Sequence, residues 1–119
     1  MGYRFGEGNL LFFQLESGFA LIKLLGVEDH GGDAVWHVCA FNDLFPDVDS
    51  IENAIERSSA FSIMIPHVVL TNRAFESTQV AKIGSSPLSE QERQHVETWR
   101  SDPNRIVSDL SIRLLTGLR

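Results

Sequence analysis

Short apolar runs alternate with turn-forming residues over the front of the chain. The run Leu10–Leu15 is followed by Glu16-Ser17-Gly18 and then by a second apolar run, Phe19–Val27. A third run, Ala34–Phe41, comes after a turn with Gly31-Gly32 at its tip. Because short apolar runs bounded by glycine turns are typical of β-hairpins, this pattern predicts three antiparallel strands joined as a meander.

The middle of the chain predicts mixed structure. Asp49 or Ser50 can cap a short helix from Ile51 to about Ser58, because either side chain can accept a hydrogen bond from the first helical turn. Beyond this helix we expect further extended segments at Phe61–Ile65, which Pro66 interrupts, at Val68–Thr71 and at Phe75–Ile83.

Two helices are predicted at the end of the chain. Ser89 and Glu92 have the spacing of a capping box and predict a helix from Glu90 to about Arg100. Pro103 suits the first position of a second helix, which Gly117 can end. Its expected features are an Asp109–Arg113 pair and an apolar stripe of Ile106, Val107, Leu110 and Leu114.

These elements predict one α+β domain over residues 1–119, with a strand-rich part (1–84) and a helical tail (86–116). The strands are expected to form a small antiparallel barrel or a strongly bent sheet, with a short middle helix and two C-terminal helices. A chain of 119 residues with 43% hydrophobic residues can bury a core without a disulfide or a metal.

Cysteine usage and hydropathy bear on the compartment. The single cysteine, Cys39, lies inside an apolar run and is interpreted as a buried structural thiol, which favours a reducing environment. Neither a bilayer-spanning apolar stretch nor a basic, apolar and small-residue export pattern is found at the start of the sequence. We therefore expect a cytoplasmic protein without membrane contact.

Charge is unevenly distributed along the chain. Residues 1–56 carry ten acidic and two basic side chains, whereas residues 57–119 carry six acidic and eight basic ones. An acidic front half disfavours contact with nucleic-acid phosphates and favours a basic protein partner. The alternative is that these acids lie in solvated turns and keep the domain soluble. The candidate partner-binding residues are Asp43, Asp47, Asp49, Glu52 and Trp36, although the sequence favours a core role for Trp36.

Residues with catalytic or metal-binding chemistry form no recognisable motif. The four histidines lack zinc-ligand spacing, and the acids between Asp43 and Glu52 lack the glycine and ligand pattern of an EF-hand. No metal and no cofactor is therefore expected. His37 and His67 lie in apolar segments, which indicates either satisfied core histidines or a candidate ligand site with acid–base capacity.

The front of the chain resembles a known family. The segments Phe5–Leu15, Ser17–Ala20 and Ile22–Leu25 resemble small bacterial SH3-like β-barrel proteins that serve as immunity proteins of polymorphic toxin systems. The segment Ile83–Glu92 that leads to Trp99 is similar to the helical tails of such proteins, and together these segments cover about half of the chain. The resemblance implies an SH3-like barrel that binds and blocks a toxin and carries no catalytic residues. Asn9 departs from the pattern, where an acidic residue is expected.

Three functions are consistent with these patterns. The first is a non-enzymatic protein-binding module, an immunity protein that inhibits a basic toxin such as a nuclease. The second is a small-molecule-binding or hydrolytic domain that uses His37 and His67. The third is a structural or regulatory homodimer subunit, with Trp99 and the last helix as its dimer face.

Overall fold

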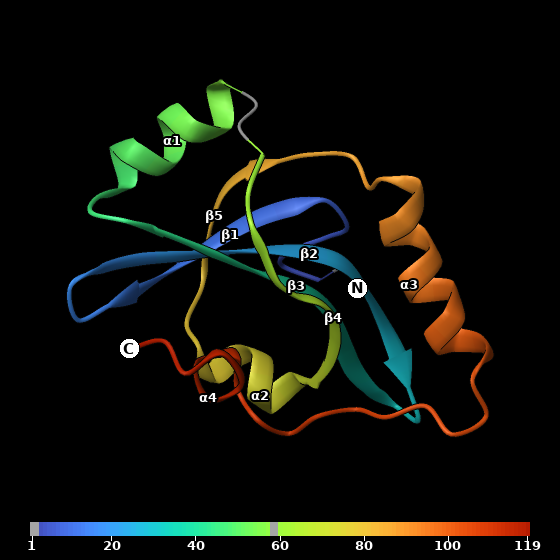
Figure 1. Ribbon diagram of the computed structural model, residues 1–119. Helices are drawn as coiled ribbons and strands as arrows, with labels where there is room; N and C mark the ends of the chain where they lie inside the picture. The colour runs from blue at the N-terminus through green and yellow to red at the C-terminus, as the bar shows by residue number, and fades with distance from the viewer. Residues whose placement is uncertain (1–2, 58–59) are drawn as a thin grey trace.

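The computed structural model describes residues 3–57 and 60–119. Five antiparallel strands form one sheet in the order β4-β3-β2-β1-β5, and four helices pack around it (Figure 1). The elements are β1 (Asn9–Leu15), β2 (Gly18–His30), β3 (Asp33–Phe45), α1 (Val48–Glu56), β4 (Ile63–Thr71), α2 (Asn72–Ser77), β5 (Ala81–Ser85), α3 (Glu90–Ser101) and α4 (Ile112–Thr116).

The predicted meander of three strands is confirmed as β1, β2 and β3. Gly31 and Gly32 form the tip of the β2–β3 hairpin with φ values of 65° and 93°, a conformation that glycine adopts without steric cost. At the β1–β2 turn, glycine is needed for space: a Cβ on Gly18 would lie 2.5 Å from the carbonyl oxygen of Phe45. Local turn chemistry therefore determines the β2–β3 hairpin, whereas Gly18 is also required by the close approach of the end of β3.

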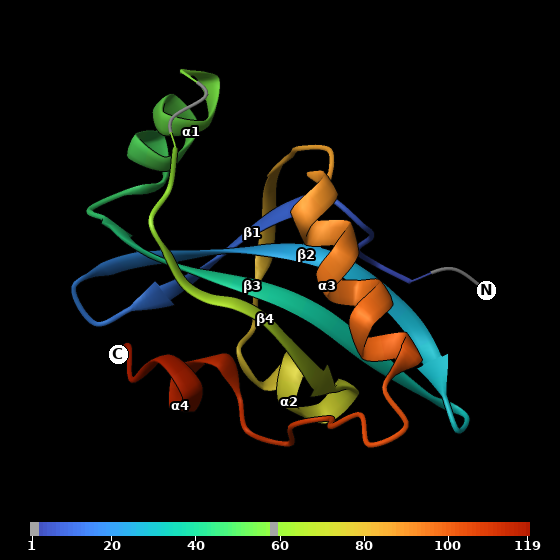
Figure 2. The same ribbon diagram turned by 45° about the vertical axis from the view of Figure 1, so that its right-hand side comes forward.

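Helices cover both faces of the sheet (Figure 2). Ala74 and Phe75 of α2 and Ile112 of α4 pack with one set of buried strand residues. Ile51 of α1 and Val96 of α3 pack with the other set. Since both faces are buried, β2 and β3 read as nearly continuous apolar runs and not as alternating ones.

The sheet is open, with β4 and β5 as its two edges. The α+β class and the antiparallel sheet are thus confirmed, whereas closure into a barrel is not observed. None of the helices in the described ranges is both long enough and apolar enough to cross a membrane.

The strand prediction for Phe75–Ile83 is wrong in its first half. Thr71 ends β4, and its side-chain oxygen accepts from the backbone N–H of Ala74, so it caps α2. The strand resumes only at Ala81 as β5. Pro66, by contrast, does not divide β4, because proline is tolerated on an edge strand.

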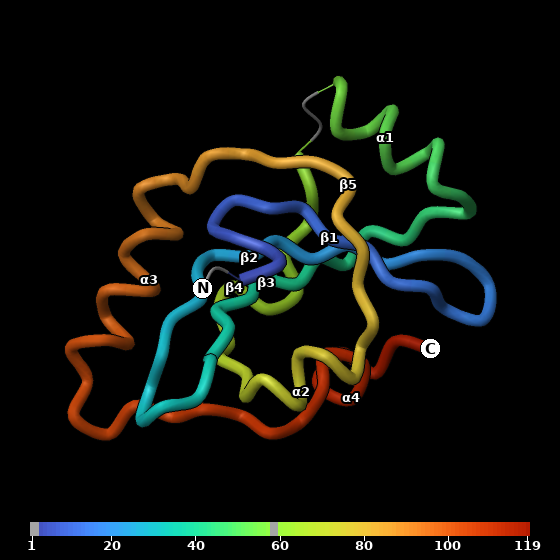
Figure 3. Tube along the Cα trace, turned by 180° about the vertical axis from the view of Figure 1, so that it is seen from behind, coloured from blue at the N-terminus to red at the C-terminus, as the bar shows by residue number. Residues whose placement is uncertain are grey.

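The C-terminal region is only partly helical. The capping box of Ser89 and Glu92 is confirmed at the start of α3. The predicted helix from Pro103 is wrong, because the chain after α3 runs irregularly across to the other face and reaches α4 only at Ile112 (Figure 3). On the way, the backbone N–H of Ser108 donates to Val69 O at 2.7 Å, and Thr71 N–H donates to Ser108 O at 2.9 Å. These bonds occupy part of the β4 edge.

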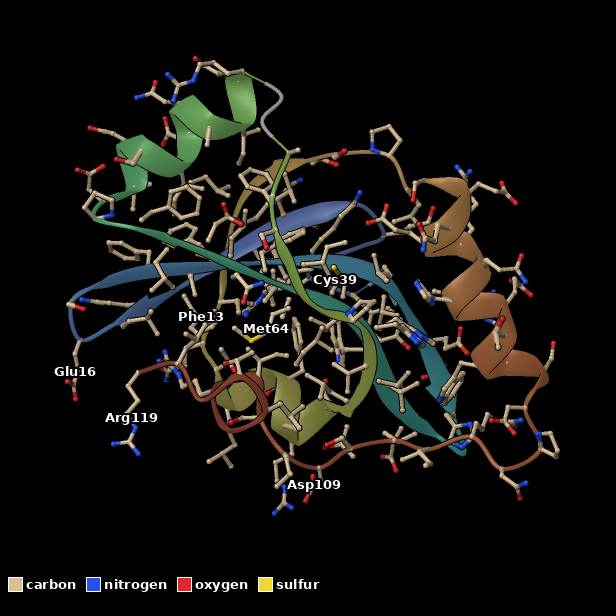
Figure 4. The ribbon with its side chains drawn as sticks, in the orientation of Figure 1. Phe13, Glu16, Cys39, Met64, Asp109 and Arg119 are labelled. Atoms are coloured by element: carbon tan, nitrogen blue, oxygen red, sulfur yellow. The ribbon has the colours of Figure 1, made fainter. Side chains whose placement is uncertain are left out.

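The side-chain pairs expected for that helix also change. Asp109 forms an ion pair with Arg73 and accepts from the Thr71 hydroxyl at 2.7 Å, and it lies far from α1 in Figure 4. Arg113 donates instead to the carbonyl oxygens of Gln14 and Thr78. The apolar stripe is largely exposed, since Ile106 is 78% exposed and Leu114 is 69% exposed.

Candidate functional sites

Two of the candidate partner-binding carboxylates are engaged in local structure. Asp47 is the N-cap of α1, and its Oδ1 accepts from the backbone N–H and the hydroxyl of Ser50, each at 2.8 Å. These hydrogen bonds lower the pKa of Asp47. Asp43 Oδ1 accepts from the backbone N–H of Ser62 at 2.7 Å, which ties the end of β3 to the chain before β4.

The sequence placed the cap of α1 two or three residues too late. Because Asp47 and not Asp49 or Ser50 is the cap, α1 starts at Val48 and ends at Glu56. The predicted helix end at Ser58 lies outside the described residues. Asp49 is therefore left in the first turn of α1, where a carboxylate interacts favourably with the helix dipole.

The acidic segment, which we define as residues 43–56, carries uncompensated charge. Asp47, Asp49, Glu52 and Glu56 are exposed, and Asp43 is half-buried. Within the described part of the chain, none of these five carboxylates forms an ion pair. Three of the six acids in the later half differ, because they pair as Glu92–Lys23, Glu97–Arg100 and Asp109–Arg73.

Two exposed apolar residues lie close to Asp43 along the two chain segments that it joins. Leu44 follows Asp43 in β3 and is 56% exposed, and Ile63, which follows Ser62, is 55% exposed. The Asp43–Ser62 hydrogen bond brings the two chain segments together. Apolar contact area beside polar groups is the usual composition of a protein interface.

Trp36 does not belong to this surface. Its side chain is 4% exposed, its indole N–H donates to Asn72 Oδ1 at 2.8 Å, and its ring stacks on Phe75 with centroids 4.0 Å apart. The predicted partner-binding role needs an accessible side chain. The structure therefore fits the alternative interpretation, in which Trp36 is a core residue.

His37 and His67 come together on the α3 face of the sheet. Nδ1 of His37 lies 2.9 Å from Nε2 of His67, and the two rings stack at an angle of 11°. His95 of α3 continues the stack, with its ring 5.9 Å from that of His67. No sequence pattern indicated this third histidine, because His95 is far from the other two along the chain and lies on a largely polar helix.

Neighbouring charges determine which nitrogen carries the proton. Glu28 Oε2 lies 3.7 Å from Nε2 of His37 and pairs with Arg100 at 2.6 Å. A proton on Nε2 faces this carboxylate, so Nδ1 of His37 is left to accept from His67 Nε2–H. Burial raises the pKa of Glu28, but the hydrogen bond and charge of Arg100 outweigh it and hold the pKa below its usual value.

Burial keeps the paired histidines neutral. It lowers the pKa of His37, against the opposing effect of Glu28. Burial and the adjacent His37 and His95 lower the pKa of His67 to about 4. His37 is fully buried, with the edge of Trp99 packed against it at 5.0 Å, so this arrangement gives a substrate no access to the inner imidazole.

Trp99 is held in place over the histidines. Its indole N–H donates to Ile106 O at 2.9 Å, and its side chain is 9% exposed. The ring therefore closes the histidine stack and is not available as the main contact of a homodimer face.

Neither a metal-binding cluster nor a reactive cysteine is found among the described residues. Among residues 3–57 and 60–119, no group of three or more His, Cys, Asp or Glu side chains is arranged to hold a metal ion. Cys39 is buried within the fold (Figure 4), and burial raises the pKa of its thiol to about 11. The thiol is thus protonated at neutral pH.

Comparison of the chain with protein-family models, with curated proteins and with solved structures finds no match.

Proposed function

We propose that the protein is a non-enzymatic protein-binding module whose acidic segment docks on a basic protein. The observation that carries this proposal is the run of five carboxylates at residues 43–56, none of which is ion-paired within the described residues, whereas three of the six acids in the later half are paired. Free carboxylates at one end of a molecule attract a basic partner and speed its encounter.

Leu44 and Ile63 add the apolar contact that long-range charge alone does not provide. Asp49 and Glu52 are free to meet a cation, because both are exposed and neither carboxylate accepts a side-chain-directed hydrogen bond within the described residues. Asp43 and Asp47 shape the surface by holding the chain on either side of it.

The finer proposal is an immunity protein of a polymorphic toxin system, which acts in the cytoplasm against a basic toxin. It is supported by the sequence resemblance, by the acidic segment and by the buried, protonated thiol. An SH3-like ancestry for the bent five-stranded sheet is part of this proposal. The buried His37 does not favour the hydrolytic alternative.

The test is a matched pair of charge reversals measured against a defined partner. The protein is purified with its partner from the native cell, and the captured basic protein is produced separately. Its affinity is measured by calorimetry at about 50 and about 300 mM salt. We expect Asp49→Lys/Glu52→Lys to weaken binding at least tenfold and to reduce the salt dependence.

The control is Glu16→Lys/Glu90→Lys, which changes net charge equally at exposed positions outside the acidic segment. Equal losses in both double variants, or binding that is insensitive to salt, would show that the acidic segment is not the docking surface.

A further inference from the structure

A cavity of about 310 Å³ opens on the α1–α3 face of the sheet. One side of it is apolar and aromatic. Phe41 and Phe61 lie there with ring centroids 5.4 Å apart, beside Leu10 of β1 and Ile55 of α1. A cavity of this size matches the lower end of known small-molecule sites.

The other side of the cavity is rich in hydrogen-bond donors. Lys23 of β2 is 6% exposed, and its Nζ donates to Pro87 O at 3.0 Å and to Glu92 Oε1 at 2.9 Å. An ammonium group has three N–H bonds, so one of them has no acceptor among the described residues. Ser85 and Ser86 also line the cavity, and no hydrogen bond to another described residue engages either hydroxyl.

Two acceptors on this side, Glu92 Oε1 and Pro87 O, are already in use. Glu92 Oε1 accepts from Lys23 and also from the backbone N–H of Ser89, where it completes the capping box of α3. Burial raises the pKa of Glu92, but its bonds to Ser89 and Lys23 outweigh this and keep the pKa low, so the group is an anion at neutral pH. Pro87 O is taken up by Lys23.

A donor-rich end beside an aromatic end specifies the chemistry of an occupant. We propose that this cavity binds a small monocarboxylate with an apolar tail. The carboxylate accepts from Lys23, Ser85 and Ser86, and the tail packs against Phe41 and Phe61. Because Glu92 already neutralises Lys23, hydrogen bonds and apolar burial hold the ligand, and the affinity is modest. No acid proposed to bind the protein partner lines the cavity, so this site is independent of that function.

Three probes separate the two ends of the site: 3-phenylpropionate, its neutral analogue 3-phenylpropanamide, and propionate. Binding is followed by amide chemical-shift changes in two-dimensional NMR spectra of the full chain. We expect 3-phenylpropionate to bind with a Kd on the order of 1 mM and to shift the amides of Ser85 and Ser86. The amide should bind at least fivefold more weakly, and propionate should give no saturable shift.

Variants test the named residues. Ser86→Ala and Phe61→Ala should each weaken 3-phenylpropionate severalfold, and Lys23→Met/Glu92→Gln should abolish saturable binding. If the last variant does not fold, the first two still decide the matter. Absence of saturable binding to the wild type, equal affinity for the amide, or unchanged affinity in Ser86→Ala and Phe61→Ala would each overturn the proposal.

The two proposals fail separately. Asp49→Lys/Glu52→Lys should bind 3-phenylpropionate like the wild type even where it no longer binds the protein partner. Loss of both activities in this variant would contradict the independence of the cavity.

Discussion

His37 and His67 share a 2.9 Å hydrogen bond between ring nitrogens, with one imidazole fully buried and the other half-buried. Only one of the two nitrogens can hold the proton between them, so the contact requires at least one of these atoms to be unprotonated. Protonation of both rings would place two cations face to face. This contact therefore makes the folded state sensitive to acid.

The sign of the pH dependence follows from the lowered pKa values. The folded pKa of His67 is about 4, below its ordinary value of 6.5, so the unfolded chain binds the proton more strongly. Stability is thus fully present above about pH 6.5 and is lost as the pH falls toward 4. We expect His67 alone to cost about 1.5 kcal/mol of unfolding free energy between about pH 6.5 and about pH 5.

Urea denaturation across this range measures the effect in wild type and in His67→Gln. The variant should show a flatter pH profile between about pH 6.5 and pH 5. His30→Gln, at an exposed histidine that also packs against Trp99, is the control. A wild-type profile that is flat in this window would contradict the neutral, buried pair.

The Lys23–Glu92 pair should contribute strongly to folding. It joins β2 to α3 at 2.9 Å with little solvent access to the ammonium. Lys23→Met leaves the Glu92 carboxylate without its cation, and we expect it to lower the unfolding free energy by about 3 kcal/mol. Lys23→Met/Glu92→Gln should recover about half of that loss, because glutamine also completes a capping box. Equal destabilisation in both variants, measured by urea denaturation, would show that charge pairing is not the cause.

Local signals explain the parts of the fold that were predicted. The hairpins at Gly18 and at Gly31-Gly32 and the capping box at Ser89 are each specified by a few adjacent residues. The helix expected after Pro103 failed for a non-local reason. Ser108 finds backbone partners on β4, and Ile106 O accepts from Trp99, so the segment satisfies its polar groups without forming a helix.

The same distinction applies to the candidate sites. The apolar setting of His37 and His67 indicated that they could form one site, but His95 and Arg100 come from α3, which is distant in sequence. Charge counting located the acidic segment but did not show that Asp47 caps α1 or that Asp43 binds the backbone of Ser62. The cavity beside Lys23 is lined by residues from β1, β2, α1 and α3, a combination that no local pattern shows.

Trp36 should behave as a core residue. Trp36→Ala removes its stack on Phe75 and its bond to Asn72, and we expect a loss of about 3–5 kcal/mol of unfolding free energy. Trp36→Phe keeps the aromatic ring and should cost less than half as much. Thermal and urea unfolding measure both. A folded Trp36→Ala variant with near wild-type stability and impaired partner binding would instead support a partner-binding role for Trp36.

Substitutions of Asp47, the cap of α1, and of Asp49, an exposed acid in its first turn, should have different effects on stability. Asp47 holds the first turn through Ser50, so Asp47→Ala should destabilise the protein by about 1 kcal/mol, whereas Asp47→Ser should retain most of the cap. Asp49 lies one position into the first turn with an exposed carboxylate, and Asp49→Ala should change stability by less than about 0.5 kcal/mol.

Urea denaturation at neutral pH distinguishes the two positions, and partner affinity measured on the same variants completes the argument. Because Asp47 acts through the backbone of α1, Asp47→Ser should leave both stability and partner binding close to wild type. Asp49→Ala should weaken partner binding while the fold is unaffected. A larger loss of stability in Asp49→Ala than in Asp47→Ala would mean that α1 starts where the sequence alone placed it, after Asp49.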